Sequence, residues 1–155
     1  MSKTSLPKPR LFVDADVLFA GSASTNEHSA SLLILRLAEV TLLEAVTSQQ
    51  VIMEVERNLE IKLPAALPAF RLLVNRCLQI VPNPQPEEVN TYVGQADPKD
   101  LPILVAAHKA RCTWLVTFNV RDFQPGHPDL IILNPGEFIL RLRYLLSEMS
   151  EKDEE

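Results

Sequence analysis

Acidic and amide side chains that could hold a metal ion occur in four separate segments of the chain. They are Asp14, Asp16, Glu54, Asp100, Asn119 and Asp122. Their oxygens are hard ligands, which favour Mg²⁺ or Mn²⁺ over zinc. Such ions activate water and stabilise the negative charge that develops when a phosphodiester is hydrolysed. The residue types therefore indicate phosphoryl chemistry, provided that the fold brings the segments together.

Gathering these carboxylates would cost energy without a cation. Two unit charges roughly 4 Å apart repel by about 4 kcal/mol at an effective dielectric constant of about 20. The histidines, His28, His108 and His127, are scattered along the chain without the spacing of a metal-binding motif. We therefore expect an almost purely oxygen ligand set around Mg²⁺ or Mn²⁺.

The first acidic pair follows a predicted strand. Residues 11–13 are apolar, and Asp14 comes directly after them, at the end of a strand where open α/β sheets bind ligands. If the chain stays extended, Asp16 faces the same way as Asp14. The alternative for a lone aspartate here is a turn former or a helix cap. A polar break over 21–29 is then expected before the next helix.

Glu54 and Asp100 belong to predicted helices. In 49–63 the apolar residues form a core stripe that Glu54 flanks, and Thr47 with Gln50 fits a capping box. The segment DPKDLP begins a helical pattern at 97–112, where Asp97 or Asp100 could each serve as a cap. Asp100 is nearer to the apolar run that must pack on the sheet.

Strand and helix patterns alternate along the whole chain. Strands are predicted at 11–13, 41–48, 78–82, 113–118 and 129–135, and helices at 29–40, 49–63, 66–77, 86–96, 97–112 and 136–149. Such alternation is typical of an α/β fold with a mostly parallel sheet covered on both faces. The last helix is amphipathic, and core packing is its favoured role, with a dimer or partner surface as the alternative.

Length and charge favour one domain over 1–148 followed by an acidic tail at 149–155, which we expect to be disordered. The net charge is −5, but residues 151–155 alone contribute four acids and one lysine. The body therefore carries a nearly balanced charge, which is compatible with a mildly basic surface around an acidic pocket. No apolar stretch reaches the ~18 residues of a membrane helix, so a cytoplasmic protein without membrane contact is expected.

Four motifs together resemble the PIN-domain family of metal-dependent ribonucleases. They are FVDADVL, TSQQVIMEV, DPKDLPILVAA and LVTFNVRDF. The resemblance implies a three-layer α/β/α sandwich with a central five-stranded sheet, and catalytic metal ligands at Asp14, Glu54 and Asp100. Asp122 or Asn119 would complete the site, because many family members carry an acid where this chain has Asn119. Asp16 and Thr117 would support the ligands.

The resemblance also implies substrate and partners. Single-stranded RNA is the usual substrate of the family, a toxin role opposed by an antitoxin protein is frequent, and a homodimer is expected. Arg121, Lys99 and Arg57 are candidates for contacts with the RNA backbone because they neighbour the proposed ligands in sequence. No base-reading residue is indicated.

Two other readings remain open. DADVL also resembles the opening motif of haloacid-dehalogenase-type phosphatases, but their chemistry needs a lysine after a late strand, and the next lysine after Thr117 is Lys152. The second is a PIN-like module that binds RNA or protein with weakened catalysis, which the neutral Asn119 would fit.

Overall fold

A five-stranded parallel sheet forms the centre of the molecule. The computed structural model describes residues 8–24, 26 and 29–154, with side chains as far as Glu148. The strands are β1 (Arg10–Val13), β2 (Glu44–Ser48), β3 (Leu78–Val81), β4 (Trp114–Val116) and β5 (Ile131–Leu133). Their order in the sheet is β3-β2-β1-β4-β5, and every neighbouring pair is parallel. The expected parallel sheet is therefore confirmed.

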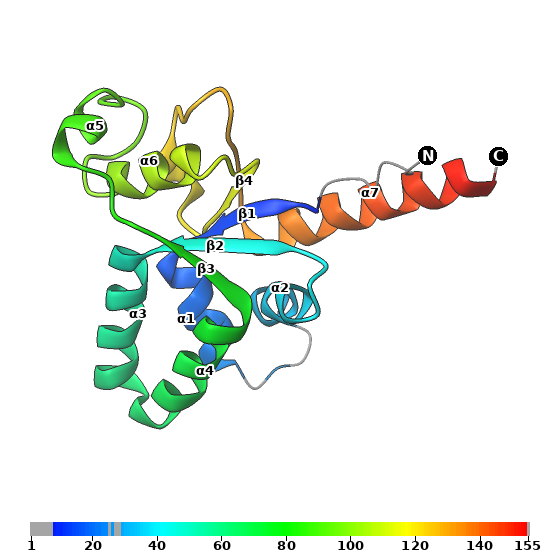
Figure 1. Cartoon of the computed structure of the whole chain (residues 1–155), viewed down its shortest axis with the longest axis horizontal. Helices are drawn as coiled ribbons and strands as arrows, with labels where there is room; N and C mark the ends of the chain where they lie inside the picture. The colour runs from blue at the N-terminus through cyan, green and yellow to red at the C-terminus, as the bar shows by residue number, and fades with distance from the viewer. Residues whose placement is uncertain (1–7, 25, 27–28, 155) are drawn as a thin grey trace.

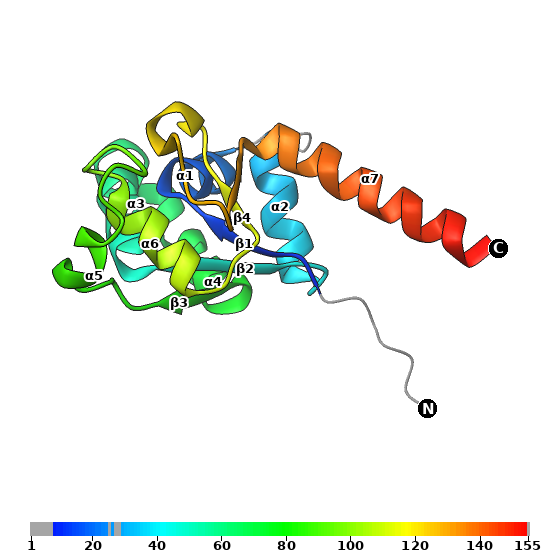
Figure 2. The ribbon, with the colours of Figure 1, turned by 90° about the horizontal axis from the view of Figure 1, so that it is seen from above.

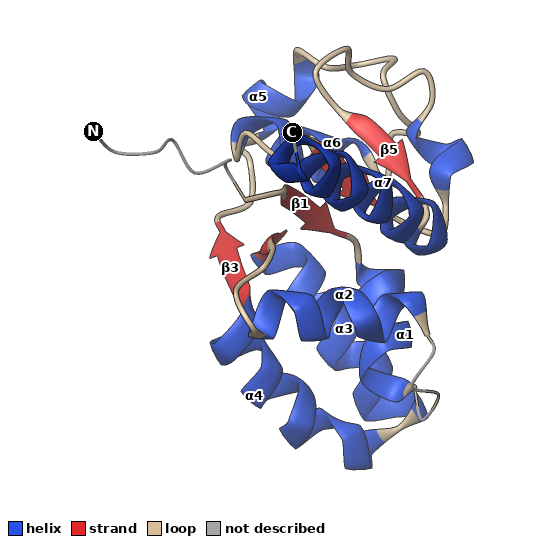
Figure 3. Ribbon diagram, turned by 90° about the vertical axis from the view of Figure 1, so that its right-hand side faces the viewer, coloured by secondary structure: helices blue, strands red, loops and turns tan. Residues whose placement is uncertain are grey.

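Helices cover both faces of this sheet, which makes the three layers of an α/β/α sandwich (Figures 1 and 3). On one face lie α1 (Ala15–Ala23), α2 (Ala30–Glu39), α3 (Gln49–Lys62) and α4 (Leu67–Cys77). On the other lie α5 (Pro86–Asn90) and α6 (Leu101–Lys109), and α7 (Pro135–Glu154) follows the last strand. Short 3₁₀ segments, η1 (Pro64–Ala66) and η2 (Val120–Phe123), complete the described elements.

The core surrounds the middle strands. Leu11, Phe12 and Val13 of β1 are fully buried, as are Leu115 and Val116 of β4. Both faces of these strands are covered by helices, so a continuous apolar run is favoured over alternation. Polar residues consequently follow the core at the carboxyl ends of the strands.

Helix α1 begins immediately after β1, which corrects the expectation of an extended Asp14–Asp16 segment and a first helix at 29–40. Asp14 is its N-cap, with an Oδ1 that accepts a hydrogen bond of 2.7 Å from the Ala15 amide. The cap reading of Asp14 is thus confirmed beside its place at the strand end. The Asp14 side chain accepts from the first amide of the helix and so favours a helix start at Ala15. The helix continues to Ala23, although the small polar residues from position 21 onward predicted a loop.

Gly21 lets α1 approach α2 closely. A Cβ atom at this position would lie 2.6 Å from Leu35 Cδ1 and 3.2 Å from the Ser31 carbonyl oxygen. Because Leu35 is fully buried, its side chain has little room to move away. The absence of a side chain at Gly21 thus sets the distance between these two helices.

Two local predictions are wrong in detail. The predicted capping box of Thr47 and Gln50 does not form, because the Thr47 hydroxyl donates to the Val13 carbonyl at 2.9 Å and Asn83 Oδ1 accepts from the Gln50 amide at 2.7 Å. The helix predicted at 86–96 ends at Asn90, since a turn with Gly94 at φ +92° follows. Tertiary contacts override the local pattern in both cases.

Helix α7 packs on the core only through its beginning. Phe138 is buried, Leu142 is half-buried, and Tyr144 and Leu146 are 63% and 57% exposed. Figure 2 shows the later turns of α7 projecting away from the rest of the molecule. The backbone of 149–154 continues α7, so the predicted boundary of the acidic tail falls inside this helix. Among the described residues, no helix is long and apolar enough to cross a membrane.

Candidate metal centre

Asp14 is a buried carboxylate held by two donors. Its side chain is only 6% exposed, and besides the Ala15 amide it accepts a hydrogen bond of 2.8 Å from Thr117 Oγ1 to Oδ2. Burial, and next the negative charge of Asp16, raise the pKa of Asp14 to about 7, although the Thr117 and Ala15 bonds lower it. The carboxylate form is therefore costly here unless a positive charge is nearby.

Asp16 lies in the first turn of α1, beside Asp14. Its Oδ2 accepts a hydrogen bond of 3.1 Å from the Phe118 amide, whereas its Oδ1 is buried without a hydrogen-bond partner. Burial raises the pKa of Asp16, and the charge of Glu54 adds to that effect. A buried carboxylate oxygen without a donor is a place where a cation would be favourable.

The segment after β4 connects these two acids to Asn119. The Thr117 hydroxyl donates to Asp14 and in turn accepts a hydrogen bond of 3.1 Å from the Asn119 amide. This chain of bonds places the amide group of Asn119 at the carboxyl end of β4, next to β1 in the sheet. The Thr117 hydroxyl therefore connects the buried carboxylate of Asp14 to the backbone at Asn119.

Asp100 and Asp97 divide two tasks at the beginning of α6. Asp97 Oδ1 accepts a hydrogen bond of 3.1 Å from the Lys99 amide and so closes a turn. Asp100 is the N-cap residue, but its side chain makes no capping bond, and its Oδ2 is buried without a partner. The structure thus separates the two alternatives for this segment, since only Asp100 keeps an unused buried oxygen.

Glu54 couples the two sides of the centre. Its charge raises the pKa values of Asp14, Asp16 and Asp100, in each case behind the larger effect of burial. The negative charge of Glu54 therefore acts on the acids of both segments. Glu54 itself is exposed on α3, where the sequence places it beside the core stripe.

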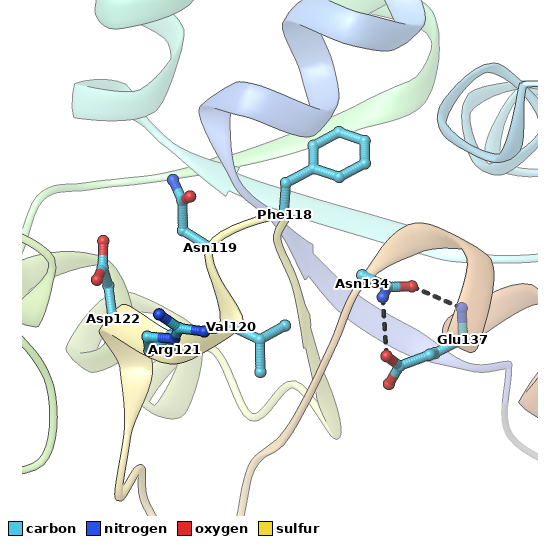
Figure 4. A pocket seen from close by; sticks show the side chains of 7 residues that line it. All are labelled: Phe118, Asn119, Val120, Arg121, Asp122, Asn134 and Glu137. Atoms are coloured by element: carbon cyan, nitrogen blue, oxygen red, sulfur yellow. Dashed lines mark hydrogen bonds between the residues drawn. The ribbon is translucent and has the colours of Figure 1, made fainter.

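Asp122 completes the acidic group from η2. Its charge raises the pKa of Asp100, and its own carboxylate forms an ion pair of 3.5 Å with Lys99. The Asp97 amide donates to the Asp122 carbonyl at 2.8 Å, which joins the two segments through their backbones. Figure 4 shows Asn119 and Asp122 extending to the same side of η2.

The acids form an open group. In the part of the chain that the structure describes, no three of these carboxylates bring one oxygen each within 4.8 Å of one another. A cavity of about 510 Å³ lies next to them, lined by 118–122 of the β4–η2 segment together with Asn134 and Glu137 (Figure 4). Asn134 and Glu137 are engaged with each other by two hydrogen bonds of 2.8 Å. Of the candidate ligands, Asn119 and Asp122 therefore border this cavity.

The donor set fits a divalent ion that prefers oxygen. Asp14, Asp16, Glu54, Asp100, Asn119 and Asp122 offer only carboxylate and amide oxygens, and two of the buried ones, on Asp16 and Asp100, have no partner. Mg²⁺ and Mn²⁺ need few protein ligands because they keep several waters, so an open group is compatible with them. Of this set, Asp16 was given only a supporting role by the family resemblance, whereas the structure shows that its Oδ1 is buried without a hydrogen-bond partner.

The basic residues near the centre have different environments. Lys99 is engaged with Asp122, Arg121 lines the cavity, and Arg57 is exposed on α3. A positive charge stabilises a partly buried carboxylate in its ionised form. Lys99 has this effect on Asp100, because its charge lowers the pKa of that carboxyl group.

The chain belongs to the PIN-domain family. A family model described as the PIN domain matches residues 10–121, which contain β1 to β4 and all the acids of the candidate centre except Asp122. A comparison with curated proteins gives no match.

Solved structures share the fold at low sequence identity. VapBC2 from Rickettsia felis, bound to a promoter DNA fragment, has a TM-score of 0.60 at 17% identity and covers 81% of this chain and 98% of its own. A toxin-antitoxin complex from Klebsiella pneumoniae gives 0.61 at 19% identity, with 81% and 97% covered. PAE2754 from Pyrobaculum aerophilum gives 0.63 at 16% identity, with 88% and 96% covered. At such identities the likeness shows the fold.

Proposed function

We propose that this protein is an endoribonuclease that depends on Mg²⁺ or Mn²⁺ and hydrolyses phosphodiester bonds of single-stranded RNA. The proposal is supported chiefly by the 6% exposed carboxylate of Asp14 beside Asp16, together with two buried oxygens, on Asp16 and Asp100, that have no hydrogen-bond partner. Membership of a family that is generally made of nucleases supports it.

Each residue contributes a distinct task in this proposal. Asp14, Asp16, Glu54 and Asp100 would hold the metal, and Asn119 or Asp122 would complete the ligands. A bound divalent ion would activate water and neutralise charge on the phosphate. Thr117 keeps Asp14 in place through its hydroxyl, and the Phe118 amide turns the second oxygen of Asp16 toward the interior.

Lys99 and Arg121 are the cations best placed to contact the phosphates of a bound strand, at the edge of the acidic group. Lys99 also limits the repulsion between Asp100 and Asp122, because it lies 3.5 Å from Asp122. The side chain of Phe118 is 51% exposed beside the cavity, where an aromatic ring offers a stacking surface to an unpaired base.

Cleavage of an unstructured RNA in Mn²⁺ tests the proposal. We expect activity in the wild type and a loss of at least about 100-fold in Asp14→Asn, Asp100→Asn and Glu54→Gln, since each removes a charge from the metal ligands. Glu60→Gln is the matched control, because Glu60 is an exposed glutamate of the same helix as Glu54.

Equal cleavage by wild type and all three variants would contradict the proposed site. RNA binding without cleavage by the wild type, in the presence of Mn²⁺, would instead favour the module that binds without catalysis.

We further propose that the protein acts in the cytoplasm as the toxin of a toxin–antitoxin pair, with a protein antitoxin as its partner. The similar solved structures include such a complex, the toxin-antitoxin complex from Klebsiella pneumoniae. A homodimer is part of the same proposal, and the exposed apolar residues of α7 support it. The division into a domain over 1–148 and a disordered acidic tail at 149–155 stays a prediction.

A further inference from the structure

A second group of potential metal ligands lies at the other end of α6 from Asp100. His108 is in the last turn of α6, and His127 and Asp129 are in the segment that joins η2 to β5. One ligand atom of each side chain lies within 4.8 Å of the others. Since α6 rises about 1.5 Å per residue, this group is roughly 12 Å along the helix from Asp100 and separate from the acidic centre.

The distances in this group are close to those of a tetrahedral site. His108 Nε2 lies 3.1 Å from Asp129 Oδ2, and His127 Nδ1 lies 3.9 Å from the same oxygen. Ligands that bind zinc at about 2.0–2.1 Å are about 3.4 Å apart in a tetrahedron. Rotations of the side chains by small amounts would thus bring all three to one ion, and the 72% exposed Asp129 side chain is free to move.

Tyr92 fixes the orientation of the central histidine. Its hydroxyl oxygen lies 2.7 Å from His108 Nδ1. The hydrogen bond of 3.1 Å between His108 Nε2 and Asp129 Oδ2 requires a proton on Nε2, since a carboxylate oxygen only accepts, and the Tyr92 hydroxyl then donates to Nδ1. With a metal on Nε2, the proton would lie on Nδ1 and be donated to Tyr92. Metal-binding histidines characteristically use the second ring nitrogen in this way, since the outer hydrogen bond fixes the tautomer and strengthens the ligand.

The two imidazole rings lie against each other, with centroids 3.8 Å apart. His127 Nδ1 accepts a hydrogen bond of 3.0 Å from the Asp129 amide, which requires an unprotonated nitrogen. A metal ion would replace that hydrogen bond by coordination.

We propose that His108, His127 and Asp129 form a second metal site, which takes a borderline transition-metal ion of the Zn²⁺ class. Two imidazole nitrogens and one carboxylate suit zinc and exclude Mg²⁺, which prefers an all-oxygen environment. Water would occupy the fourth position, because the group lies at the surface. The site rests on this geometry alone and does not depend on the nuclease activity.

The ion would fasten the 124–130 segment to the end of α6. This segment already contacts 91–97 through the Gly126 amide, which donates to the Gln95 carbonyl at 2.8 Å. Coordination would link His108 of α6 to His127 and Asp129 of this segment. The segment follows η2, which carries Asp122, so the ion would also restrict the position of η2. The expected result is a more stable fold, since the ion binds only the folded arrangement.

Co²⁺ is a suitable probe, because tetrahedral Co²⁺ absorbs visible light far more strongly than octahedral Co²⁺. The full chain, cleared of metal with a chelator, is titrated with Co²⁺ in excess Mg²⁺, which occupies oxygen sites. We expect strong visible absorption that saturates at one Co²⁺ per chain and is displaced by Zn²⁺. A melting curve recorded with and without Zn²⁺ provides a second readout.

Variants assign the ligands. Asp129→Ala alters an exposed side chain and should fold normally, yet it should weaken Co²⁺ binding at least tenfold, as should His108→Gln and His127→Gln. Tyr92→Phe should weaken it by about tenfold while leaving the spectrum tetrahedral, because only the orienting hydrogen bond is lost. Asp14→Asn is the control and should bind Co²⁺ as the wild type does.

Two results would overturn the proposal. One is a wild-type chain that shows no intense absorption at millimolar Co²⁺. The other is a tetrahedral spectrum of unchanged affinity in Asp129→Ala and His127→Gln, which would place the ion elsewhere.

Discussion

Asp14 shows how one side chain combines a structural and a chemical task. It caps α1 and accepts a hydrogen bond from the Thr117 hydroxyl, and its pKa is raised to about 7 by burial and by the charge of Asp16. The raised pKa means that the folded chain binds a proton on the Asp14 carboxyl group more tightly than the unfolded chain does. Protonated Asp14 therefore favours folding below about pH 4. That contribution is lost as pH rises from about 4 to about 7.

The first prediction follows from this titration. Without divalent metal, the free energy of unfolding should fall between pH 4 and pH 8 by a few kcal/mol in the wild type, and by distinctly less in Asp14→Asn, because asparagine carries no proton to lose. Urea denaturation of both proteins across this range measures the difference between them, in which the titrations of groups remote from Asp14 cancel.

Divalent metal supplies the control. Millimolar Mg²⁺ at pH 8 should restore stability in the wild type and much less in Asp14→Asn, because the ion neutralises the buried carboxylate. Parallel pH profiles of the two proteins, with no response to Mg²⁺ in either, would contradict the assignment of Asp14 as a ligand.

At the same scale, sequence reasoning found most of the acidic residues but misjudged their environment. Asp14 and Asp100 were proposed from their places beside apolar runs, and the structure buries the carboxylate of Asp14 and one carboxylate oxygen, Oδ2, of Asp100. The unused oxygen of Asp16 was missed because an extended segment was expected where α1 begins at Ala15. The pairing of His108 with His127 was also missed, since residues 19 positions apart meet only through the loop that follows η2.

Helices α1 and α2 depend on a position without a side chain. A Cβ atom at Gly21 would press on Leu35 and on the Ser31 carbonyl, although alanine is the better helix former. Gly21→Ala should therefore destabilise the fold by about 1–2 kcal/mol, because overpacking exceeds the gain in propensity. Thermal or urea unfolding measures this change.

Gly136 in the first turn of α7 offers the matched comparison. A Cβ atom there would lie 3.5 Å from Asn134 Oδ1, an ordinary contact. Gly136→Ala should leave stability unchanged or raise it by up to about 1 kcal/mol. Equal effects of the two alanines would show that the packing of α1 on α2 is looser than the distances indicate.

Elements were more predictable than their ends. The alternation of strands and helices gives the parallel sheet because it records burial on both faces of the middle strands. Where a boundary depends on a distant partner, as with Thr47 bonded to Val13, the local pattern misleads. Helix α1 was not predicted for the same reason, because it is stabilised by contacts with α2 and α3, which are distant in the sequence.

The molecule as a whole leaves an apolar surface on α7. Leu140, Tyr144 and Leu146 are more than half exposed, and a groove of about 400 Å³ lies between α2 and α7. Exposed apolar area of this kind is unfavourable in water and is relieved by association. We expect sedimentation velocity at micromolar concentration to give twice the 17.4 kDa mass of the chain.

Variants locate the contact. Leu146→Glu should shift the protein to the monomer, because a charge would enter the apolar contact, whereas Glu148→Gln on the same helix should not. A monomer in the wild type, or a dimer unaffected by Leu146→Glu, would contradict a dimer formed by α7.

The backbone bond between the Asp97 amide and the Asp122 carbonyl has a consequence for the interpretation of mutagenesis. It is made by main-chain atoms, so replacing either aspartate with asparagine leaves this bond and the relative position of the two segments unchanged. A defect in Asp122→Asn can therefore be attributed to the missing charge itself, without invoking displacement of the neighbouring helix.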